Sequence, residues 1–335
     1  MKKTKSFISC ATLTLALMVL LSASAMAAET YVIRVASIQP ETHPDLALIK
    51  TVFEPYVEEH SNGRIKVEIY ANAQMGGDRE YIEGIQLGTL QWAATTTSVL
   101  GNFEPGFNVV EMPYLFTSRE AAFKALDGKL GKELDKRLPK LGMINLGYIE
   151  NGFRHVTNNK RPINSAMDLK GLKIRTMEVP AHISFFKRLG ANPTPMNFGE
   201  LYTALQQGTV DGQENPLVLI SDCKLNEVQK YCSLTGHIFS VCVNMFSKKF
   251  YDSLPDDLKK VIDEAAARYV AEHRMAMERG EIEVRQALEK QGMKINDLLD
   301  KDKKAFVEAG VATLNEYSDK IGNDIVELAK SYINN

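Results

Sequence analysis

The chain of 335 residues has four cysteines, one tryptophan and no second long apolar segment after its N-terminus. It has no polybasic run and a formal net charge of −2, which argues against nucleic acid and anionic membrane surfaces as partners. The nucleophile motif G-x-S-x-G and the zinc-protease motif H-E-x-x-H are absent. If a chain of this composition binds an anion, it must do so through a few local arginines rather than through its overall charge.

The N-terminus has the three parts of a secretory signal peptide: Lys2, Lys3 and Lys5, an apolar run over about residues 7–21, and a stretch of small residues. We expect residues 1–27 to be the signal peptide, cleaved near Ala27, and the product to be exported to the periplasm without inserting into the membrane. A retained membrane helix is the alternative, but the run is short of the roughly 20 residues that a span needs.

Three cysteines remain after this cleavage, namely Cys223, Cys232 and Cys242. Export permits a disulfide, but an odd number leaves at least one free thiol. Two interpretations stay open: all three are small buried apolar residues, or Cys232 and Cys242 form a bridge. No histidine lies at metal-ligand spacing from them, so we expect no metal and no cofactor.

Alternating strand and helix patterns predict a parallel or mixed sheet covered on both faces. A mature chain of about 300 residues favours two lobes over one core. The predicted strands are 31–36, 64–70, 92–97, 142–148, 172–175 and 241–246, and the predicted helices are 45–60, 78–87, 180–189 and 198–208.

The C-terminal third differs from the rest, because residues 256–291 contain no proline and carry apolar residues at helical spacing. A continuous helix of this length reaches on the order of 50 Å. We therefore expect it to lie across both lobes, with a coiled-coil partner helix as the alternative.

Three polar residues stand out as candidates for holding a small acid. Arg175 ends the strand 172–175, and Arg154 lies in Asn151-Gly-Phe-Arg154, which we expect to form a loop after a strand. Asn215 lies in Asp211-Gly-Gln-Glu-Asn-Pro216, which we expect to form a turn. Ligands of open α/β sheets lie beyond the carboxyl ends of the strands, so both arginines are placed to grip a carboxylate.

The chain resembles solute-binding proteins of the tripartite ATP-independent periplasmic (TRAP) transporters, the DctP-type family, over essentially the whole mature sequence. No single motif is specific, but their order is. The motifs are Tyr70-Ala-Asn-Ala-Gln-Met-Gly-Gly-Asp-Arg79, Glu111-Met-Pro-Tyr-Leu-Phe116, Asn151-Gly-Phe-Arg154, Asp168-Leu-Lys-Gly-Leu-Lys-Ile-Arg-Thr176, Gly190-Ala-Asn-Pro-Thr-Pro-Met196 and Gly208-Thr-Val-Asp-Gly-Gln-Glu-Asn-Pro216.

The resemblance implies a two-lobed α/β periplasmic binding protein (type II-like) with mixed sheets, a hinge, one cleft between the lobes and a long C-terminal helix. We assign residues 28–152 and 241–281 to lobe I and residues 153–240 and 282–335 to lobe II. The resemblance also implies that Arg175 binds the ligand carboxylate. The other residues that it implies at the site are Arg154, Asn215, Phe198, Asp78, Gln39 and Thr96, with His43 and Trp92 as further lining residues.

The ligand class is a small organic acid. Sialic-acid binders of the family carry a carboxylate near the position of Thr96 and an asparagine near that of Gln39, so sialic acid is disfavoured. His43-Pro44 is similar to members that bind uronates, which makes a sugar acid the preferred ligand over a dicarboxylate or a small sulfonate. We expect a monomer that delivers its ligand to the integral-membrane TRAP subunits.

Two other functions share these features. An exported enzyme acting on a sugar acid would need a general base, and His155 beside Arg154 is the best candidate. A binding protein that reports to a membrane sensor would use the same cleft and differ only in its docking surface.

Overall fold

A single mixed sheet of nine strands forms the centre of the molecule in a computed structural model that describes residues 29–333. The strands follow the order β2-β1-β3-β8-β4-β7-β5-β6, with β9 paired to β8. Their bounds are β1 Tyr31–Ala36, β2 Ile65–Tyr70, β3 Trp92–Thr96, β4 Met143–Asn158, β5 Lys173–Thr176, β6 Asn192–Pro195, β7 Gly212–Pro216, β8 Tyr231–Ser247 and β9 Lys294–Asp297. The predicted signal peptide lies outside the described residues.

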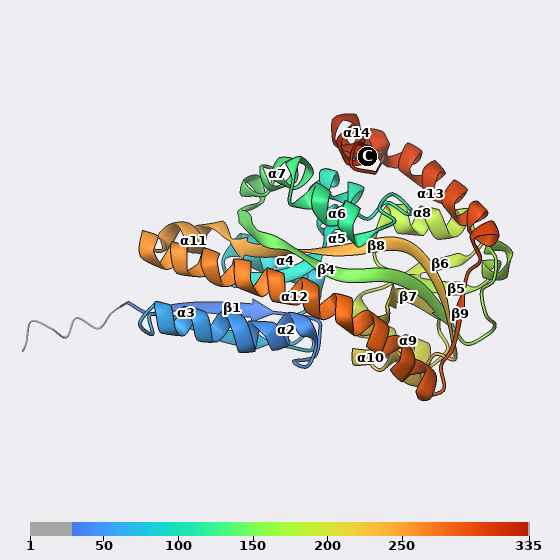
Figure 1. Cartoon of the computed structure of the whole chain (residues 1–335), viewed down its shortest axis with the longest axis horizontal. Coiled ribbons are helices and arrows are strands. Elements are labelled where there is room, and N and C mark those ends of the chain that lie inside the picture. Colours follow the sequence, from blue (N-terminus) through green and yellow to red (C-terminus); the bar gives the residue numbers. More distant parts are fainter. Residues whose placement is uncertain (1–28, 334–335) are drawn as a thin grey trace, which may run out of the picture.

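Helices cover both faces of this sheet, as Figure 1 shows. They are α2 Pro44–Leu48, α3 Glu54–His60, α4 Asp78–Leu87, α5 Thr97–Leu100, α6 Arg119–Leu126, α7 Lys129–Asp135, α8 Pro180–Arg188, α9 Phe198–Gln206, α10 Leu217–Asp222, α11 Lys248–Ser253, α12 Asp256–Lys290, α13 Asp300–Ile321 and α14 Asn323–Lys330. A π-helical segment, Ile49–Phe53, joins α2 to α3, so the predicted helix 45–60 is one continuous element with a changed hydrogen-bond pattern.

The strands β4 and β8 are long enough to belong to both halves of the molecule. The first part of β4 pairs with the end of β8, which in turn pairs with β3. The last part of β4 pairs with β7. The ladder shifts register between Glu150 and Gly152, and Gly152 has a φ of +114°, which only glycine adopts easily. The two halves of the sheet therefore meet at an irregular point in the two strands that they share.

Each half has its own hydrophobic core on either face of the sheet. In the first half, β1 and β3 pack against α3 and the start of α12, and the opposite face is covered by α4, α6 and α7. In the second half, β5 packs against α8 and the start of α13, and α9 and α10 pack against the end of α12. This layered, two-lobed arrangement confirms the predicted fold class.

The long helix α12 lies across both halves, as predicted (Figure 1). Its residues Ile262 and Tyr269 pack in the core of the first half, whereas Leu288 packs in the core of the second half. Along its length α12 contacts β4, α2, α3 and α10 within the same chain. Its buried face is thus used internally. The coiled-coil alternative has no support in this packing.

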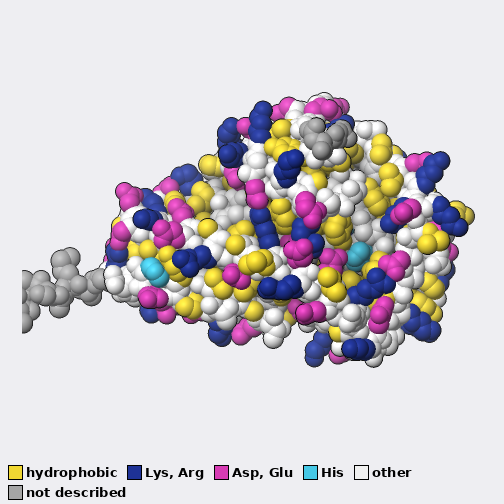
Figure 2. Space-filling view, in the orientation of Figure 1, with side chains coloured by type: hydrophobic (Ala, Val, Ile, Leu, Met, Phe, Trp, Pro, Cys, Tyr) yellow, Lys and Arg dark blue, Asp and Glu magenta, His cyan; other side chains and the backbone are white. Residues whose placement is uncertain are grey.

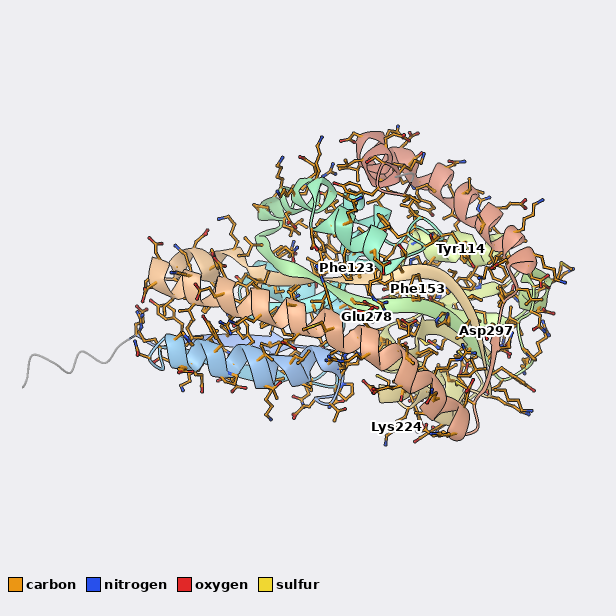
Figure 3. All side chains as sticks on the ribbon, in the orientation of Figure 1. Tyr114, Phe123, Phe153, Lys224, Glu278 and Asp297 are labelled. Atoms are coloured by element: carbon orange, nitrogen blue, oxygen red, sulfur yellow. The ribbon has the colours of Figure 1, made fainter. Side chains whose placement is uncertain are left out.

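Aromatic side chains fix α6 against the shared strands. Phe123 of α6 lies 5.7 Å from Phe239 of β8, and Phe153 of β4 lies 4.9 Å from the same ring, with the distances measured between ring centroids. The guanidinium carbon of Arg274 lies 3.8 Å from the centroid of Phe123. Figure 3 labels Phe123 and Phe153 near the middle of the molecule. These contacts tie α12, α6 and both long strands together beside the irregular point of the sheet.

The C-terminal helices do not follow the proposed lobe boundary. Phe306 of α13 packs in the core beneath α8, but Leu314, Ile325 and Ala329 pack with α6 and α7 in the first half. The division into lobes stays a proposal, and this packing places residues from about Leu314 onward with the first half instead of lobe II.

Among residues 29–333, no cysteine forms a disulfide: Cys232 and Cys242 are both buried and free, and Cys223 is half-buried and free. The interpretation as small buried apolar residues holds for Cys232 and Cys242 but not fully for Cys223, and the bridge between Cys232 and Cys242 is wrong. Over the same range no helix is both long and apolar enough to cross a membrane. The face in Figure 2 shows acidic and basic side chains interspersed.

Candidate functional site

A cavity with an outer and an inner part lies between the two halves of the molecule. The outer part has a volume of about 340 Å³ and the inner part about 30 Å³. Four residues line both parts and mark the neck between them: Asp78, Arg175, Met177 and Phe198. Because Asp78 belongs to the first half and the other three to the second, the neck is built from both sides.

Arg175 is held at this neck by backbone contacts. It is the third residue of β5, and its Nε and Nη2 donate to the carbonyl oxygen of Met196 at 3.0 and 2.6 Å. Its Nη1 is buried without a hydrogen-bond partner among residues 29–333, and the structure gives it no carboxylate partner in that range. Burial lowers the pKa of Arg175 to about 10, so the group is still a cation at neutral pH. The ring of Phe198 lies 5.8 Å from its guanidinium carbon.

Arg154 also lines the inner part, but its charge is already neutralised inside the protein. Its Nε and Nη2 donate to the two carboxylate oxygens of Glu214 at 2.6 and 2.8 Å, and both side chains are fully buried. Burial alone raises the pKa of Glu214, but the charge of Arg154 overcomes this effect and holds the pKa well below its ordinary value. The two arginines therefore differ within residues 29–333, because Arg154 has an internal carboxylate partner and Arg175 has none.

The strands around Arg154 also differ from the prediction. Asn151-Gly-Phe-Arg154 lies inside β4 and is not a loop, and Asp211–Pro216 is mostly the buried strand β7 and not a turn. Arg154 pairs with Pro216 across the β4–β7 ladder, and Gln213 of β7 pairs with Arg175 of β5. Three neighbouring strands thus bring the candidate residues together through sheet register.

Asn215 is near the cavity, as predicted, but its amide is largely used within the protein. Its Oδ1 accepts a hydrogen bond from Nη2 of Arg154 at 3.0 Å, and its Nδ2 donates to Oε1 of Gln213. Gln213 donates in turn to Thr157 at 2.9 Å. On the other side, Glu214 lies 3.1 Å from Nε2 of His237. Asn215 therefore orients Arg154 within a buried network.

The opposite side of the inner part carries the predicted residues Gln39, Thr96 and Asp78. Thr96 caps α5, and its hydroxyl lies 3.7 Å from Sδ of Met177, whereas Oε1 of Gln39 lies 3.8 Å from Sγ of Cys223. Asp78 is the first residue of α4, and its Oδ1 accepts a hydrogen bond from Thr95 at 2.7 Å. Burial raises the pKa of Asp78, while Thr95 and Arg175 act in the opposite direction.

Two predicted lining residues lie away from the cavity. Trp92 is fully buried in the first half, where its ring packs on Phe53 and its Nε1 donates to Asn244 at 3.2 Å. His43 is buried behind Asp45, with 3.2 Å between Nδ1 and the carboxylate, and only Asp45 lines the inner part. The large aromatic side chain of Trp92 fills a core position instead of a binding surface.

The site has no arrangement typical of catalysis. His155, the candidate general base, is buried outside the cavity and accepts a hydrogen bond from the backbone N–H of Gly236 at 3.1 Å. Burial lowers the pKa of His155 to about 3, so it has little tendency to take up a proton at neutral pH. Within residues 29–333 no group of three or more His, Cys, Asp or Glu side chains is arranged to hold a metal ion.

Sequence reasoning missed two important residues of the site. Glu214 stands next to Asn215 in the sequence, and a carboxylate in a buried strand needs a cationic partner, which was the available signal. Met177 follows β5 and lines both parts of the cavity, but no local pattern marks it.

Comparison with known proteins agrees with this geometry. The profile of the family described as bacterial extracellular solute-binding protein, family 7 (DctP) matches residues 35–320. The 2,3-diketo-L-gulonate-binding periplasmic protein YiaO of Escherichia coli is 33% identical over 257 residues, which cover 77% of this chain and 78% of that protein. The chain belongs to the DctP family of TRAP solute-binding proteins, whose members bind solutes and are not enzymes.

Solved structures extend the comparison to bound ligands. A sugar acid binding protein from Advenella mimigardefordensis in complex with galactonate has a TM-score of 0.88 and 34% identity, covering 91% of this chain and 98% of that one. A TRAP solute-binding protein from Sulfurospirillum deleyianum with bound succinate has a TM-score of 0.86 and 29% identity, covering 91% and 99%. Similar folds in this family therefore hold both sugar acids and dicarboxylates.

Proposed function

We propose that this protein binds a sugar acid in the cavity between its two halves and delivers it to an integral-membrane TRAP transporter. The single observation that carries the proposal is the buried cation of Arg175, which lines the cavity and has no carboxylate partner within the described chain. A buried charge without a partner is costly, and a ligand carboxylate would remove that cost.

The second guanidinium supports the same ligand. Nη1 of Arg154, like Nη1 of Arg175, is buried without a hydrogen-bond partner in the described part of the chain, and both residues line the inner part. A carboxylate has two oxygens and accepts one charge-assisted hydrogen bond from each arginine. Since Glu214 already balances Arg154, the pair presents two donor groups but only one net positive charge.

The remaining lining residues suit the rest of a sugar acid. Phe198 offers an apolar ring beside Arg175, while Gln39, Thr96 and Asp78 offer polar atoms for hydroxyl groups. The preference for a uronate depended on His43, which lies behind Asp45, so we propose the wider class of sugar acids. We also propose cleavage near Ala27, a periplasmic location and a monomeric carrier.

Calorimetry tests the proposal with D-galactonate, D-galacturonate and D-erythronate, and with galactitol as an uncharged ligand of matching carbon skeleton. Arg175→Met should weaken binding of the acids by about a hundredfold or more, because one charge-assisted contact in a desolvated site is removed. Arg161→Met is the matched control, since Arg161 likewise donates to the backbone through Nε and Nη2, to the carbonyls of Asp168 and Lys170, but does not line the cavity.

Two results would contradict the proposal: galactitol binding as tightly as the acids, or Arg175→Met binding the acids with near-normal affinity. Delivery is tested separately by uptake of the radiolabelled acid into cells that express this protein with its TRAP membrane subunits. Uptake should require both components.

A further inference from the structure

Two asparagines that line the outer part of the cavity each reach across to the backbone of the opposite half. Asn102 follows α5 in the first half, and its Nδ2 donates at 3.0 Å to the carbonyl oxygen of Glu178, which follows β5 in the second half. Asn197, the N-cap of α9 in the second half, lies directly against Gly77, the residue before α4 in the first half. The two contacts run in opposite directions, so together they join the halves beside the outer part of the cavity.

Gly77 makes room for Asn197 because it has no side chain. A Cβ atom at this position would overlap Nδ2 of Asn197 and lie only 3.0 Å from its Cγ and Oδ1, and the three atoms nearest to it all belong to Asn197. Non-bonded carbon atoms normally stay about 3.5–4.0 Å apart. Asn197 cannot swing away without cost, because its Oδ1 caps α9 by accepting a hydrogen bond from the N–H of Gly199 at 2.9 Å.

The backbone at Gly77 does not itself require a glycine. Its φ of −106° and ψ of −168° are an extended conformation that any residue adopts, whereas the neighbouring Gly76 has a φ of +98°, which favours glycine. The N–H of Gly77 donates to Oε2 of Glu80 at 2.8 Å, and an alanine would keep this hydrogen bond. The close approach of the other half is therefore what demands a glycine here.

We infer that Gly77 controls the affinity for every ligand of this cavity without touching any of them. Asn197 seats against position 77 only if this position carries no side chain, and this seat holds the two halves closed. The inference rests on the proposed function and assigns closure to a residue that lines neither part of the cavity. Gly77 is thus a positioning residue.

The effect on affinity follows from where the binding groups lie. Arg175 belongs to the second half and Gln39 to the first, so a ligand contacts both only when the halves are together. The apparent affinity is the affinity of the closed form multiplied by the fraction of molecules in that form. A methyl group at position 77 lowers this fraction, and the resulting factor is the same for all ligands that need both halves.

The test is calorimetry with the full mature protein and with Gly77→Ala, using D-galactonate, D-galacturonate and D-erythronate. Gly77→Ala should weaken binding of all three acids by about tenfold or more, and by the same factor to within about twofold. Its urea midpoint without ligand should match that of the wild type, because the local backbone accepts an alanine. Small-angle X-ray scattering at saturating galactonate should give Gly77→Ala a larger radius of gyration than the wild type.

Gly199→Ala is the matched control. Gly199 has room for a Cβ atom, whose nearest neighbour is Oδ1 of Asn197 at 3.6 Å, and the described residues place no atom of the first half within 4 Å of it. The change adds the same methyl group beside the same asparagine and keeps the N–H that caps α9. It should leave all three affinities unchanged.

A second change in the opposite half decides whether the methyl group acts through Asn197. Asn197→Gly removes the side chain that meets position 77 and leaves a residue that is acceptable as an N-cap. In the double variant Gly77→Ala with Asn197→Gly, the halves have room to close again. Its affinities should therefore be no weaker than those of Asn197→Gly alone, a clear departure from additivity.

The outcomes separate this inference from the proposed function. If Gly77→Ala binds the acids as tightly as the wild type, the inference is wrong and the proposed function stands. A lower urea midpoint in ligand-free Gly77→Ala, or a methyl group that is equally harmful in the absence of the Asn197 side chain, would locate the effect within the first half and also overturn the inference. If the wild type binds none of the sugar acids, the proposed function fails and the inference fails with it.

Discussion

The two walls of the cavity differ in how strongly their polar groups are already bonded within the protein. On the wall formed by β4, β5 and β7, Arg154 is held by the carboxylate of Glu214 at 2.6 and 2.8 Å, and Arg175 by the carbonyl of Met196. On the wall formed by β3, α4 and the residues after β1, Asp78 is held by Thr95 at 2.7 Å, but the contacts of Gln39 and Thr96 across the cavity are longer and involve the sulfur atoms of Cys223 and Met177.

This difference indicates a division of labour between the walls. Donors that are fixed before the ligand arrives bind its carboxylate with little loss of side-chain freedom. Weak hydrogen bonds to sulfur are easily exchanged for bonds to ligand hydroxyls. The first wall would supply the strength of binding, and the second would distinguish one acid from another. Both sulfur contacts also join the two halves across the cavity, so hydroxyls that replace them would take over that link.

The most severe way to break the first wall is Glu214→Gln. The change leaves the buried Arg154 without its carboxylate, and uncompensated buried charges destabilise proteins by about 3–5 kcal/mol. Urea denaturation should show a loss of this size in the free energy of unfolding. Glu316→Gln is the matched control, because Glu316 also pairs with an arginine, Arg188, but at an exposed site, where about 1 kcal/mol or less is expected.

A double variant, Arg154→Met with Glu214→Gln, sharpens this prediction. It removes the buried cation as well, so it should recover part of the lost stability while binding of sugar acids stays weak. Equal losses of stability in Glu214→Gln and Glu316→Gln would show that the buried pair is not what holds this wall.

The buried histidines behind the first wall give a prediction about pH. Burial lowers the pKa of His155 and of His182 to about 3 in the folded protein, compared with about 6.5 when unfolded. A histidine with a lowered folded pKa contributes stability fully above pH 6.5 and loses that contribution as the pH falls toward 3. Each of the two should therefore reduce the free energy of unfolding by about 1.4 kcal/mol per pH unit below pH 6.

Denaturation curves at pH 7, 6, 5.5 and 5 measure this slope. His182→Leu should make this slope shallower, because one contribution is lost while those of His155 and of His237, whose pKa burial also lowers, remain. Glu214 and Asp45 have lowered pKa values, so their contributions are lost only below about pH 4.5. Burial lowers the pKa of His43, but Asp45 outweighs this effect and raises the pKa above its ordinary value. The contribution of His43 to stability is therefore lost only as the pH rises above 6.5. An unchanged slope in His182→Leu would contradict the prediction.

Local patterns in the sequence predicted the short elements of the fold well. The helix 78–87 was bounded by Gly88, which has a left-handed φ of +80° and ends α4 as expected. The strands β4 and β8 are 16 and 17 residues long, more than twice the predicted lengths, because glycines such as Gly147 and Gly236 interrupt the apolar pattern that indicates a strand. Their continuity depends on pairing between distant segments, which no local pattern contains.

The candidate site was predictable in its residues but not in their bonding. Arg154, Arg175 and Asn215 do come together, yet Asp211-Gly and Asn215-Pro are turn signals that masked the buried strand β7. Which arginine has its charge balanced internally depends on the register of β4 against β7, since that register brings Glu214 to Arg154 and not to Arg175. Motif spacing carries no information about this choice.

The mildest way to sharpen the comparison is a change on the second wall, Gln39→Ala. Gln39 is buried, lines the inner part and has only a thiol contact at its Oε1, so the change should leave the free energy of unfolding within about 1 kcal/mol of the wild type. Loss of one hydrogen bond to a ligand hydroxyl should weaken binding of D-galactonate by about fivefold. A three-carbon hydroxy acid such as D-lactate has too few hydroxyls to reach both walls, so its weaker affinity should not change. If Gln39→Ala reduced the affinities of galactonate and lactate equally, the second wall would also be binding the carboxylate, and the proposed division between the two walls would be wrong.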